Sequence, residues 1–317
     1  MPLRFDSRSI AALAWFLAIA WLASRCATAA AEAPRDAKIK KVLLVGIDGC
    51  RFDAVRAANA PNLDALAAAG ALSENMLILG DRFQGNDTIS GPGWSSILTG
   101  VWADKHGVLD NKFPQPNFEK YPHFFRRIKD ASPESQTASL VDWEPIQKYI
   151  VSAADVARVF PEGAGYLSGD EQVEREAVRL LAEDDPAALF VYFGQVDEAG
   201  HNHGFHPEVK AYRRAIERVD AHLGRVLAAL RGRKNFEGES WLVLVTTDHG
   251  GKGLKHGGGH AVPEVLHSFL IVSGPAAAQG KIEGPTYLVD VVPTVLAHLG
   301  VRADPEWGLD GRAVGLR

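Results

Sequence analysis

Three apolar stretches of the sequence are each followed by side chains that could bind a metal ion. The pairs are 42–47 with Asp48, 188–193 with Asp197 and His201, and 241–245 with Asp248 and His249. Ligands of open α/β sheets bind at the edge where the carboxyl ends of the strands meet, so these side chains are expected to lie together. Three carboxylates at one edge repel one another, and some would take up protons unless a cation were present. The spacing therefore predicts a metal site.

A sixth ligand is expected from the segment KHGGGH, which offers His256 and His260. Mixed aspartate and histidine ligation suits zinc. Six protein ligands exceed what one tetrahedral zinc with an open position needs, and they suit two ions. Two metal ions roughly 4 Å apart form a clamp for phosphoryl transfer, because they steady both the attacking and the leaving oxygen. The sequence predicts two Zn²⁺, although each ligand taken alone would also fit a polar turn.

A nucleophile for such chemistry is expected from the segment DTISGPGWSSILTG. Its hydroxyls belong to Thr88, Ser90, Ser95, Ser96 and Thr99. Ser90 stands before Gly-Pro-Gly, which predicts a tight turn, and a helix is expected over 94–98. The free N–H groups at a helix start can hold a phosphate, and nearby zinc would activate the hydroxyl. A serine in this position also fits a helix cap, and Thr88 is the competing hydroxyl.

The elements that position these residues can be placed from hydrophobic periodicity. Four continuous apolar runs, 42–47, 188–193, 241–245 and 269–272, are typical of strands buried on both faces of a parallel sheet. Helices are expected from Pro207 to Leu230, where apolar residues recur at steps of three and four, and also near 171–182 and 288–299. This alternation predicts an α/β domain in which helices cover both faces of a mostly parallel central sheet.

The N-terminal segment has the pattern of a targeting signal. Arg4 and Arg8 precede an apolar run over 10–23, which is shorter than the roughly 20 residues of a membrane-spanning helix. We therefore expect residues 1–33 to be a cleaved signal peptide of a secreted or periplasmic protein. A membrane anchor, or a lipoprotein signal at Cys26, is the alternative. Residues 34–317 are expected to form a single domain with no stable membrane span and at most a small cap within 113–159.

The net charge limits the classes of partner that are expected, and the cysteine content limits the possible disulfides. Residues 1–30 carry three arginines and one aspartate, so their removal changes the formal net charge from −5 to about −7. An acidic protein is a poor non-specific binder of nucleic acid, and a small-molecule substrate is expected instead. Cys50 would be the one cysteine left, which excludes an internal disulfide. The sequence does not predict an oligomeric state.

Taken together, the motifs resemble those of a known family. The segments LLVGIDGCR, SGPGWSSILTGVWADKHGV, VDEAGHNHG, VTTDHGG and LVDVVPTVLAHLGV occur in the order seen in the alkaline phosphatase superfamily. From about residue 41 onward the chain most resembles the type I phosphodiesterase/nucleotide pyrophosphatase family. The resemblance implies an α/β/α sandwich and two zinc ions. Asp48, Ser90, Asp248 and His249 would hold one ion, and Asp197, His201 and His256 the other, with His256 favoured over His260 by its His-Gly-Gly context.

The resemblance also implies individual roles. In this family the nucleophile lies nine residues before the threonine of a helix-ending Thr-Gly, which here counts back from Thr99 to Ser90. A phosphate-contacting asparagine matches Asn111. Many nucleotide pyrophosphatases carry Thr-Phe-Pro-Asn where this chain has Ser-Gly-Pro-Gly, so a preference for nucleotides does not carry over directly.

These observations predict a secreted zinc-dependent hydrolase of phosphate esters that acts through a phosphoseryl intermediate at Ser90, with phosphodiesters favoured. A phosphomonoesterase is an alternative, because Arg51, Lys105, Lys252 or Lys255 could neutralise the extra charge of a monoester. A sulfatase is another, although Trp94 replaces the arginine of the C/S-x-P-x-R motif. A non-catalytic, zinc-stabilised binding protein on the same fold is the third.

Overall fold

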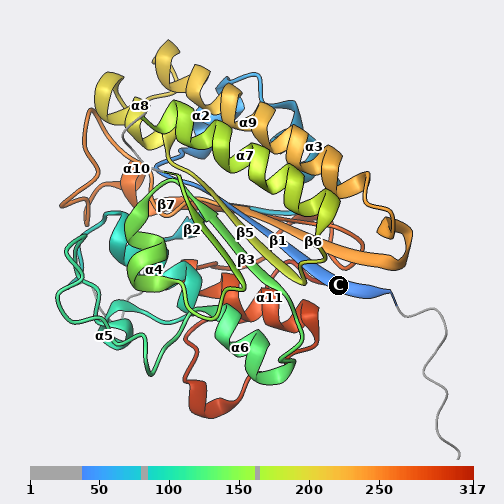
Figure 1. The fold of residues 1–317 in the computed structure, drawn as a ribbon. Coiled ribbons are helices and arrows are strands. Elements are labelled where there is room, and N and C mark those ends of the chain that lie inside the picture. The colour runs from blue at the N-terminus through green and yellow to red at the C-terminus, as the bar shows by residue number, and fades with distance from the viewer. Residues whose placement is uncertain (1–37, 80–84, 161–164) are drawn as a thin grey trace, which may run out of the picture. The chain divides into compact units, whose positions relative to one another are not determined.

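The computed structural model describes residues 38–79, 85–160 and 165–317, and residues 39–317 form one compact unit (Figure 1). The expected signal peptide, residues 1–33, lies outside the described residues. Within the described part of the chain, no helix is both long enough and apolar enough to cross a membrane.

The centre of this unit is an eight-stranded sheet with the strand order β4-β3-β5-β1-β6-β7-β2-β8. The strands are β1 (Ile39–Ile47), β2 (Ala71–Leu77), β3 (Thr137–Val141), β4 (Val156–Val159), β5 (Ala188–Phe193), β6 (Glu239–Thr246), β7 (His267–Ser273) and β8 (Gly280–Lys281). The four predicted apolar runs are β1, β5, β6 and β7. The sheet is mostly parallel, as predicted, but β7 is antiparallel to both of its neighbours, β6 and β2. The expectation of a parallel strand at 269–272 is therefore wrong, because a continuous apolar run reports burial on both faces and not direction.

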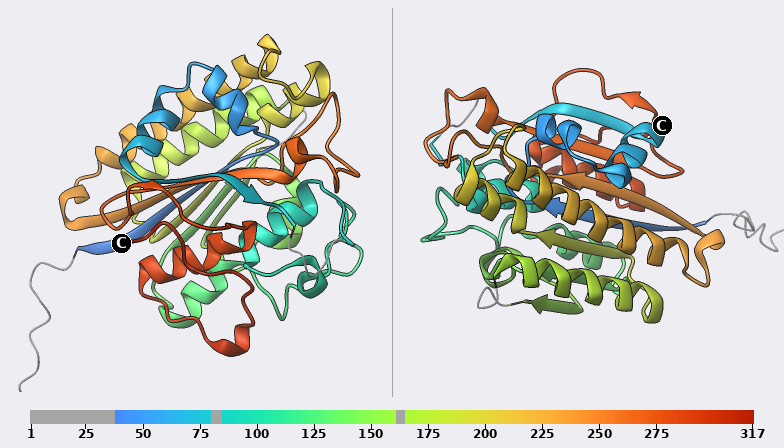
Figure 2. Two further views of the ribbon diagram at one scale, coloured as in Figure 1. Left: turned by 180° about the vertical axis from the view of Figure 1, so that it is seen from behind. Right: turned by 90° about the horizontal axis from the view of Figure 1, so that it is seen from above.

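Helices cover both faces of the sheet, which confirms the predicted sandwich (Figures 1 and 2). One face carries α2 (Phe52–Ala57), α3 (Pro61–Ala69), α7 (Tyr166–Glu183), α8 (Gln195–His203) and α9 (Lys210–Arg231). The other carries α4 (Ser90–Thr99), α5 (Ala103–His106), α6 (Phe124–Ala131) and α11 (Val291–Leu299). Short elements complete the described chain: α10 (Pro263–Leu266), the π-helix η1 (Ile146–Ile150), and the 3₁₀ helices η3 (Phe236–Gly238), η4 (Leu288–Asp290) and η5 (Pro305–Trp307).

All four predicted helix starts differ from the structure, and the helices expected near 171 and 288 begin at Tyr166 and Val291. The helix expected from Pro207 begins at Lys210, because residues 206–209 form a turn in which the Val209 N–H donates to the His206 carbonyl at 2.9 Å. The helix expected over 94–98 begins at Ser90, so Gly91, Pro92 and Gly93 lie in its first turn rather than in a tight turn before it. Proline is tolerated in a first turn because its missing N–H would have no intrahelical partner there. The segment 113–159, where the sequence allows a small cap, contributes α6, β3 and β4 to the sandwich.

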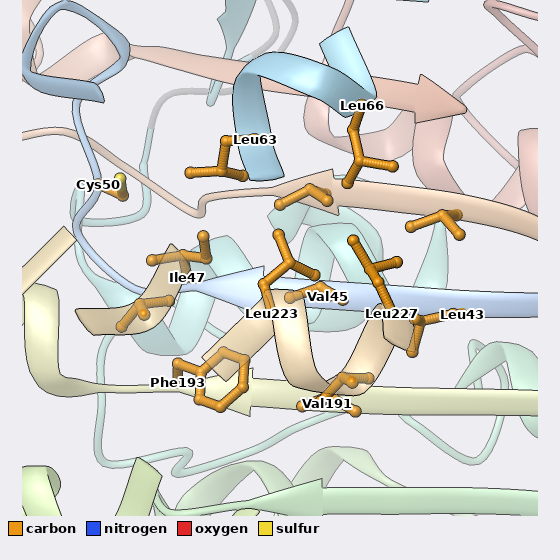
Figure 3. Close-up of a cluster of buried hydrophobic side chains, with 14 of the residues drawn as sticks. Leu43, Val45, Ile47, Cys50, Leu63, Leu66, Val191, Phe193, Leu223 and Leu227 are labelled. Carbon is orange, nitrogen blue, oxygen red and sulfur yellow. The ribbon is translucent and has the colours of Figure 1, made fainter. Parts of the chain in front are cut away.

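Alternate side chains of the strands other than β8 pack into two hydrophobic cores. Figure 3 shows one core, in which Leu43, Val45 and Ile47 of β1 pack beneath Leu223 and Leu227 of α9. In the other core, α4 is buried along its whole length. The indole of its Trp94 lies against Gly46 of β1, where a methyl group added to the glycine would come within 2.3 Å of a ring carbon. The absence of a side chain at Gly46 thus allows Trp94 to reach the strand.

This contact makes Gly46→Ala a test of the packing of α4 on the sheet. We expect it to lower the free energy of unfolding by about 1–3 kcal/mol, because the added methyl overpacks a fully buried site. Denaturant titration would measure the change. Gly238→Ala is the matched control, since an added methyl there meets nothing within 4 Å, and its effect should stay within about 0.5 kcal/mol. Equal changes in the two variants would contradict this account of the packing.

Candidate metal centre

The three carboxylates predicted to converge lie at neighbouring strand ends. Asp48 follows β1 directly, and Asp248 lies two residues beyond β6. The helix α8, which carries Asp197, begins two residues after β5. β1 lies between β5 and β6 in the sheet, so all three carboxylates come to the same edge. The strand order thus accounts for the meeting of residues far apart in the sequence.

Asp197 and His201 lie one turn apart on α8, which the sequence analysis did not predict as a helix. Side chains four residues apart share one helix face, and the His201 Nε2 lies 3.4 Å from the Asp197 Oδ2. The segment VDEAGHNHG contains two glycines together with Asp197 and Asn202, all residues that favour turns, so the sequence did not indicate a helix here.

The predicted ligand set forms two overlapping groups. Ligand atoms of Asp48, Asp248 and His249 lie within 4.8 Å of one another, and so do those of Asp197, His249 and His256. The His201 Nε2 lies 2.9 Å from the His256 Nε2. His260 is exposed and belongs to neither group. The geometry therefore favours His256 over His260, as did the resemblance of its His-Gly-Gly context.

All three histidines are oriented in the same way. The Nδ1 atom of His249 lies 2.9 Å from the carbonyl oxygen of Gly250, that of His201 lies 2.9 Å from the carbonyl of Leu254, and that of His256 lies 3.1 Å from the carbonyl of Thr88. A carbonyl only accepts, so each Nδ1 donates its hydrogen, and the Nε2 of each neutral ring carries a lone pair. These lone pairs are directed into the cluster. Histidines that bind metals typically donate their other N–H to a carbonyl or carboxylate in this way.

The Nε2 lone pairs face carboxylate oxygens, which are also acceptors. The His249 Nε2 lies 3.1 Å from the Asp248 Oδ2 and 3.6 Å from the Asp48 Oδ1. The Asp248 Oδ2 and the Asp197 Oδ1 are buried and accept no hydrogen bond from any described residue. Acceptors that face one another without a proton between them require a cation, so the residues fit metal ions.

Electrostatics at the site agree with this geometry. The pKa of Asp248 is raised well above its usual range by burial and by the charges of Asp48 and Asp197. The pKa of Asp197 is raised by burial and by Asp48. Burial lowers the pKa of His249, and burial and His249 lower the pKa of His256 to about 2. His249 and His256 therefore stay neutral, the form that binds metal, while the carboxylates lack a compensating positive charge.

Two aromatic residues hold Asp48 in place, and neither was predicted. The Trp94 Nε1 donates to the Asp48 Oδ2 at 2.8 Å, and the Tyr192 hydroxyl donates to the same oxygen at 2.6 Å. The other oxygen, Oδ1, is left facing Ser90 and His249. Trp94 lies within α4 and Tyr192 within β5, where buried aromatic residues are typical of the core. The sequence therefore held no signal of their contact with the site.

Ser90 is the first residue of α4, and its side chain lies beside the cluster. The Ser90 Oγ is 3.3 Å from the His249 Nε2 and 3.4 Å from the Asp48 Oδ1. The N–H of Gly91 donates to the Asn111 Oδ1 at 2.6 Å. A side chain at Gly93 would come within 2.9 Å of the Asp248 Cβ, so glycine there lets the helix start approach the site.

The other hydroxyls of this segment are engaged elsewhere. Ser95 and Thr99 each donate to a backbone carbonyl of α4 at 2.6 Å, and Ser96 lies 3.1 Å from the His106 Nε2. Thr88 donates to the His256 carbonyl at 2.5 Å and accepts from the Gly259 N–H at 2.8 Å. Thr88 therefore holds the glycine-rich loop, and Ser90 is the one hydroxyl of these five that lines the cavity over the cluster.

This cavity has a volume of about 380 Å³. Its walls are formed by candidate metal ligands, by polar residues and by aromatic residues. The ligands are Asp48, Asp197, His201 and His256, the polar residues are Ser90, Asn111 and Lys255, and the aromatic residues are Trp143, Tyr166 and Tyr192. The arrangement places a hydroxyl, a side-chain amide and a candidate metal centre around one space that a small molecule can enter.

Known proteins resemble this chain both in sequence and in fold. The family model for type I phosphodiesterase/nucleotide pyrophosphatase matches residues 42–274. The chain is 27% identical over 229 residues to the bovine bis(5'-adenosyl)-triphosphatase ENPP4, covering 66% of this chain and 47% of that protein. It is 25% identical over 233 residues to human ectonucleotide pyrophosphatase/phosphodiesterase family member 7, with the same two coverages. The chain thus spans about half the length of the curated relatives it matches.

Solved structures show the fold at lower identity. Murine ectonucleotide pyrophosphatase/phosphodiesterase 5 superposes with a TM-score of 0.64 at 15% identity, over 84% of this chain and 96% of that chain. A 2-O GAG sulfatase superposes with a TM-score of 0.68 at 15% identity, over 86% of this chain and 73% of that chain. The architecture is that of the alkaline phosphatase superfamily. Because the family model matches residues 42–274, which are most of this chain, the chain belongs to the type I phosphodiesterase/nucleotide pyrophosphatase family.

Proposed function

We propose that the protein is a zinc-dependent hydrolase of phosphate esters, with Ser90 as its nucleophile. The observation that carries the proposal is the orientation of His201, His249 and His256, whose Nε2 lone pairs are directed at the carboxylates of Asp197 and Asp248. Such a set has the donor chemistry of Zn²⁺. Asp48, Ser90, Asp248 and His249 would hold one ion, and Asp197, His201 and His256 the other.

When bound there, zinc would lower the pKa of the Ser90 hydroxyl and stabilise the charge on the leaving oxygen. The side chains then have separate tasks. The Ser90 Oγ gives up its proton and forms a bond to phosphorus while the ester P–O bond on the opposite side breaks, and the leaving oxygen takes up a proton and departs as an alcohol. Asn111, whose Oδ1 is held by the Gly91 N–H, keeps its side-chain N–H groups available for a phosphate oxygen. Water then cleaves the phosphoseryl bond and restores the Ser90 hydroxyl.

Phosphodiesters are the favoured substrates, because the matched relatives are phosphodiesterases and a bis(5'-adenosyl)-triphosphatase. The aromatic wall of Trp143, Tyr166 and Tyr192 offers an apolar surface for an organic group. A sulfatase is disfavoured, because Trp94 stands where sulfatases carry an arginine and is committed to Asp48. The proposed secretion or periplasmic location depends on the sequence of residues 1–33 alone.

A substrate panel tests the proposal against its alternatives. The protein, with zinc added or chelated, would be assayed with bis-p-nitrophenyl phosphate, p-nitrophenyl phosphate and p-nitrophenyl sulfate. We expect zinc-dependent turnover of the phosphates, highest for the diester, and none of the sulfate. Turnover of the sulfate would indicate a sulfatase. Full zinc occupancy without turnover of any substrate would indicate a binding protein.

Replacing one buried carboxylate should have opposite effects with and without metal. In the metal-free protein, we expect Asp248→Asn to raise the free energy of unfolding by about 1 kcal/mol or more, because it removes a buried charge that Asp48 and Asp197 repel. The amide can keep the hydrogen bond that Asp248 accepts from the Gly49 N–H. In zinc-loaded protein the same change should be destabilising, because a ligand is lost.

Urea unfolding with chelator and with zinc would measure both effects of Asp248→Asn. Asp64→Asn, at an exposed position of α3, is the control and should change the free energy of unfolding by less than about 0.5 kcal/mol in both conditions. A loss of stability in the metal-free Asp248→Asn variant would show that repulsion among the carboxylates is not the dominant interaction.

Ser90→Ala tests the nucleophile. We expect turnover to fall by roughly three or more orders of magnitude, because the covalent route is closed, while the fold and most of the bound zinc remain. Ser95→Ala removes a hydroxyl of the same helix that bonds to the Gly91 carbonyl and should retain activity. Acid trapping of the phosphoenzyme, with mass spectrometry of the modified peptide, would identify the residue. Phosphate on Thr88, or full activity in Ser90→Ala, would reject Ser90.

A further inference from the structure

The four basic residues that could neutralise extra substrate charge differ in their contacts. Three are bound to acceptors of the protein itself. The acceptors are Asp53 and the carbonyls of Phe205 and Gly251 for Arg51, Asp310 and the Gly308 carbonyl for Lys105, and Glu264 for Lys252. Arg51 is also largely buried. The positive charges of these three side chains are therefore already neutralised by groups of the protein, and the side chains are poorly placed to bind a substrate.

Lys255 has a different environment. Lys255 lines the cavity that also contains Ser90 and Asn111. It forms no side-chain hydrogen bond or ion pair with any described residue. Apart from two histidines, Lys255 is the one basic residue among the described residues of the cavity wall. Its ammonium group is therefore available to an anion in the cavity.

The backbone on both sides of Lys255 is fixed. Lys252 and Lys255 exchange backbone hydrogen bonds of 2.8 and 3.2 Å. The carbonyl of Leu254 accepts from His201, and the carbonyl of His256 accepts from Thr88. The base of the lysine side chain is thus held beside the candidate metal centre, while its charged end can move toward a ligand. A flexible lysine suits a charge whose position differs between substrates.

The remaining side chains of the cavity wall do not provide a positive charge that could bind a second anionic oxygen. Asn111 and Ser90 are neutral, and Trp143, Tyr166 and Tyr192 are aromatic. A diester carries one negative charge at phosphorus, which the metal centre can accommodate. A second anionic oxygen would have to be neutralised by another cation in the same cavity.

We propose that Lys255 is a specificity-determining residue that binds a second anionic oxygen of the substrate. That oxygen belongs either to the scissile phosphorus, as in a phosphomonoester, or to a phosphate group next to it, as in a diphosphate. The inference depends on the proposed function in one respect, since it assumes that the phosphoryl group lies beside Ser90. Such a contact would explain why this protein, although related to phosphodiesterases, would also accept more highly charged substrates.

The test compares substrates of different charge in zinc-loaded wild type and in Lys255→Ala. The substrates are bis-p-nitrophenyl phosphate, p-nitrophenyl phosphate and adenosine diphosphate. We expect the substitution to lower kcat/KM for one or both of the more highly charged substrates by roughly 10- to 100-fold, the loss of one charge-assisted hydrogen bond. The singly charged diester should change by less than about threefold. A loss confined to p-nitrophenyl phosphate assigns the oxygen to the scissile phosphorus, and one confined to adenosine diphosphate assigns it to a neighbouring phosphate.

Two variants serve as controls. Lys255→Arg keeps the charge and should retain most of the activity on the highly charged substrates. Lys252→Ala removes a lysine three residues away that is exposed and paired with Glu264, and it should leave all substrates unchanged. Equal losses for the three substrates in Lys255→Ala, or no loss for any of them, would overturn the inference.

Binding of inorganic phosphate, measured by calorimetry, separates this inference from the proposed function because it needs no turnover. If the oxygen belongs to the scissile phosphorus, we expect Lys255→Ala to weaken phosphate binding by a similar factor, and Lys252→Ala to leave it unchanged. If the wild type hydrolyses none of the esters yet binds phosphate through Lys255, the inference stands and the proposed function fails. If the esters are hydrolysed and Lys255→Ala changes neither phosphate binding nor kcat/KM for adenosine diphosphate, the inference fails and the proposed function stands.

Discussion

Repulsion among Asp48, Asp197 and Asp248, brought together at one edge of the sheet, is the interaction on which the rest of the site depends. The carboxylates are buried or nearly so, and the nearest polar groups include imidazole nitrogens that present lone pairs. Burying even one unpaired charge costs several kcal/mol. A fold that brings negative charges together in this way is stable only if the carboxylates are protonated or bind cations. Metal binding and stability are therefore coupled in this chain.

The sandwich creates this arrangement through a few specific contacts. The order β5-β1-β6 brings three strand ends side by side. His201 lies one turn after Asp197 on α8, so both side chains lie on the same face of that helix. On the opposite face, α4 lies close to the sheet because Gly46 and Gly93 have no side chains to separate them. Trp94 belongs to the hydrophobic core and also donates to Asp48. Packing of the core and orientation of the site are thus parts of the same contact.

Much of this site could be predicted because its chemistry lies at strand ends. A continuous apolar run reveals a buried strand, and a carboxylate after it falls at the ligand-binding edge, which is how Asp48 and Asp248 were identified. The short or partly polar strands β2, β3, β4 and β8 carry no such signal. The direction of β7 depends on how the chain returns from β6, which an apolar run does not record. The choice between His256 and His260 depends on the path of a glycine-rich loop, and Thr88 fixes that path from a distant part of the sequence.

We propose that two zinc ions hold the carboxylates and histidines together. Diffraction from crystals of the zinc-loaded protein, recorded on both sides of the zinc absorption edge, tests it most directly. The account predicts two anomalous peaks roughly 4 Å apart, one in contact with Asp48, Asp248 and His249 and the other in contact with Asp197, His201 and His256. The absence of zinc from both positions, or a single ion bound only by carboxylate oxygens, would contradict it.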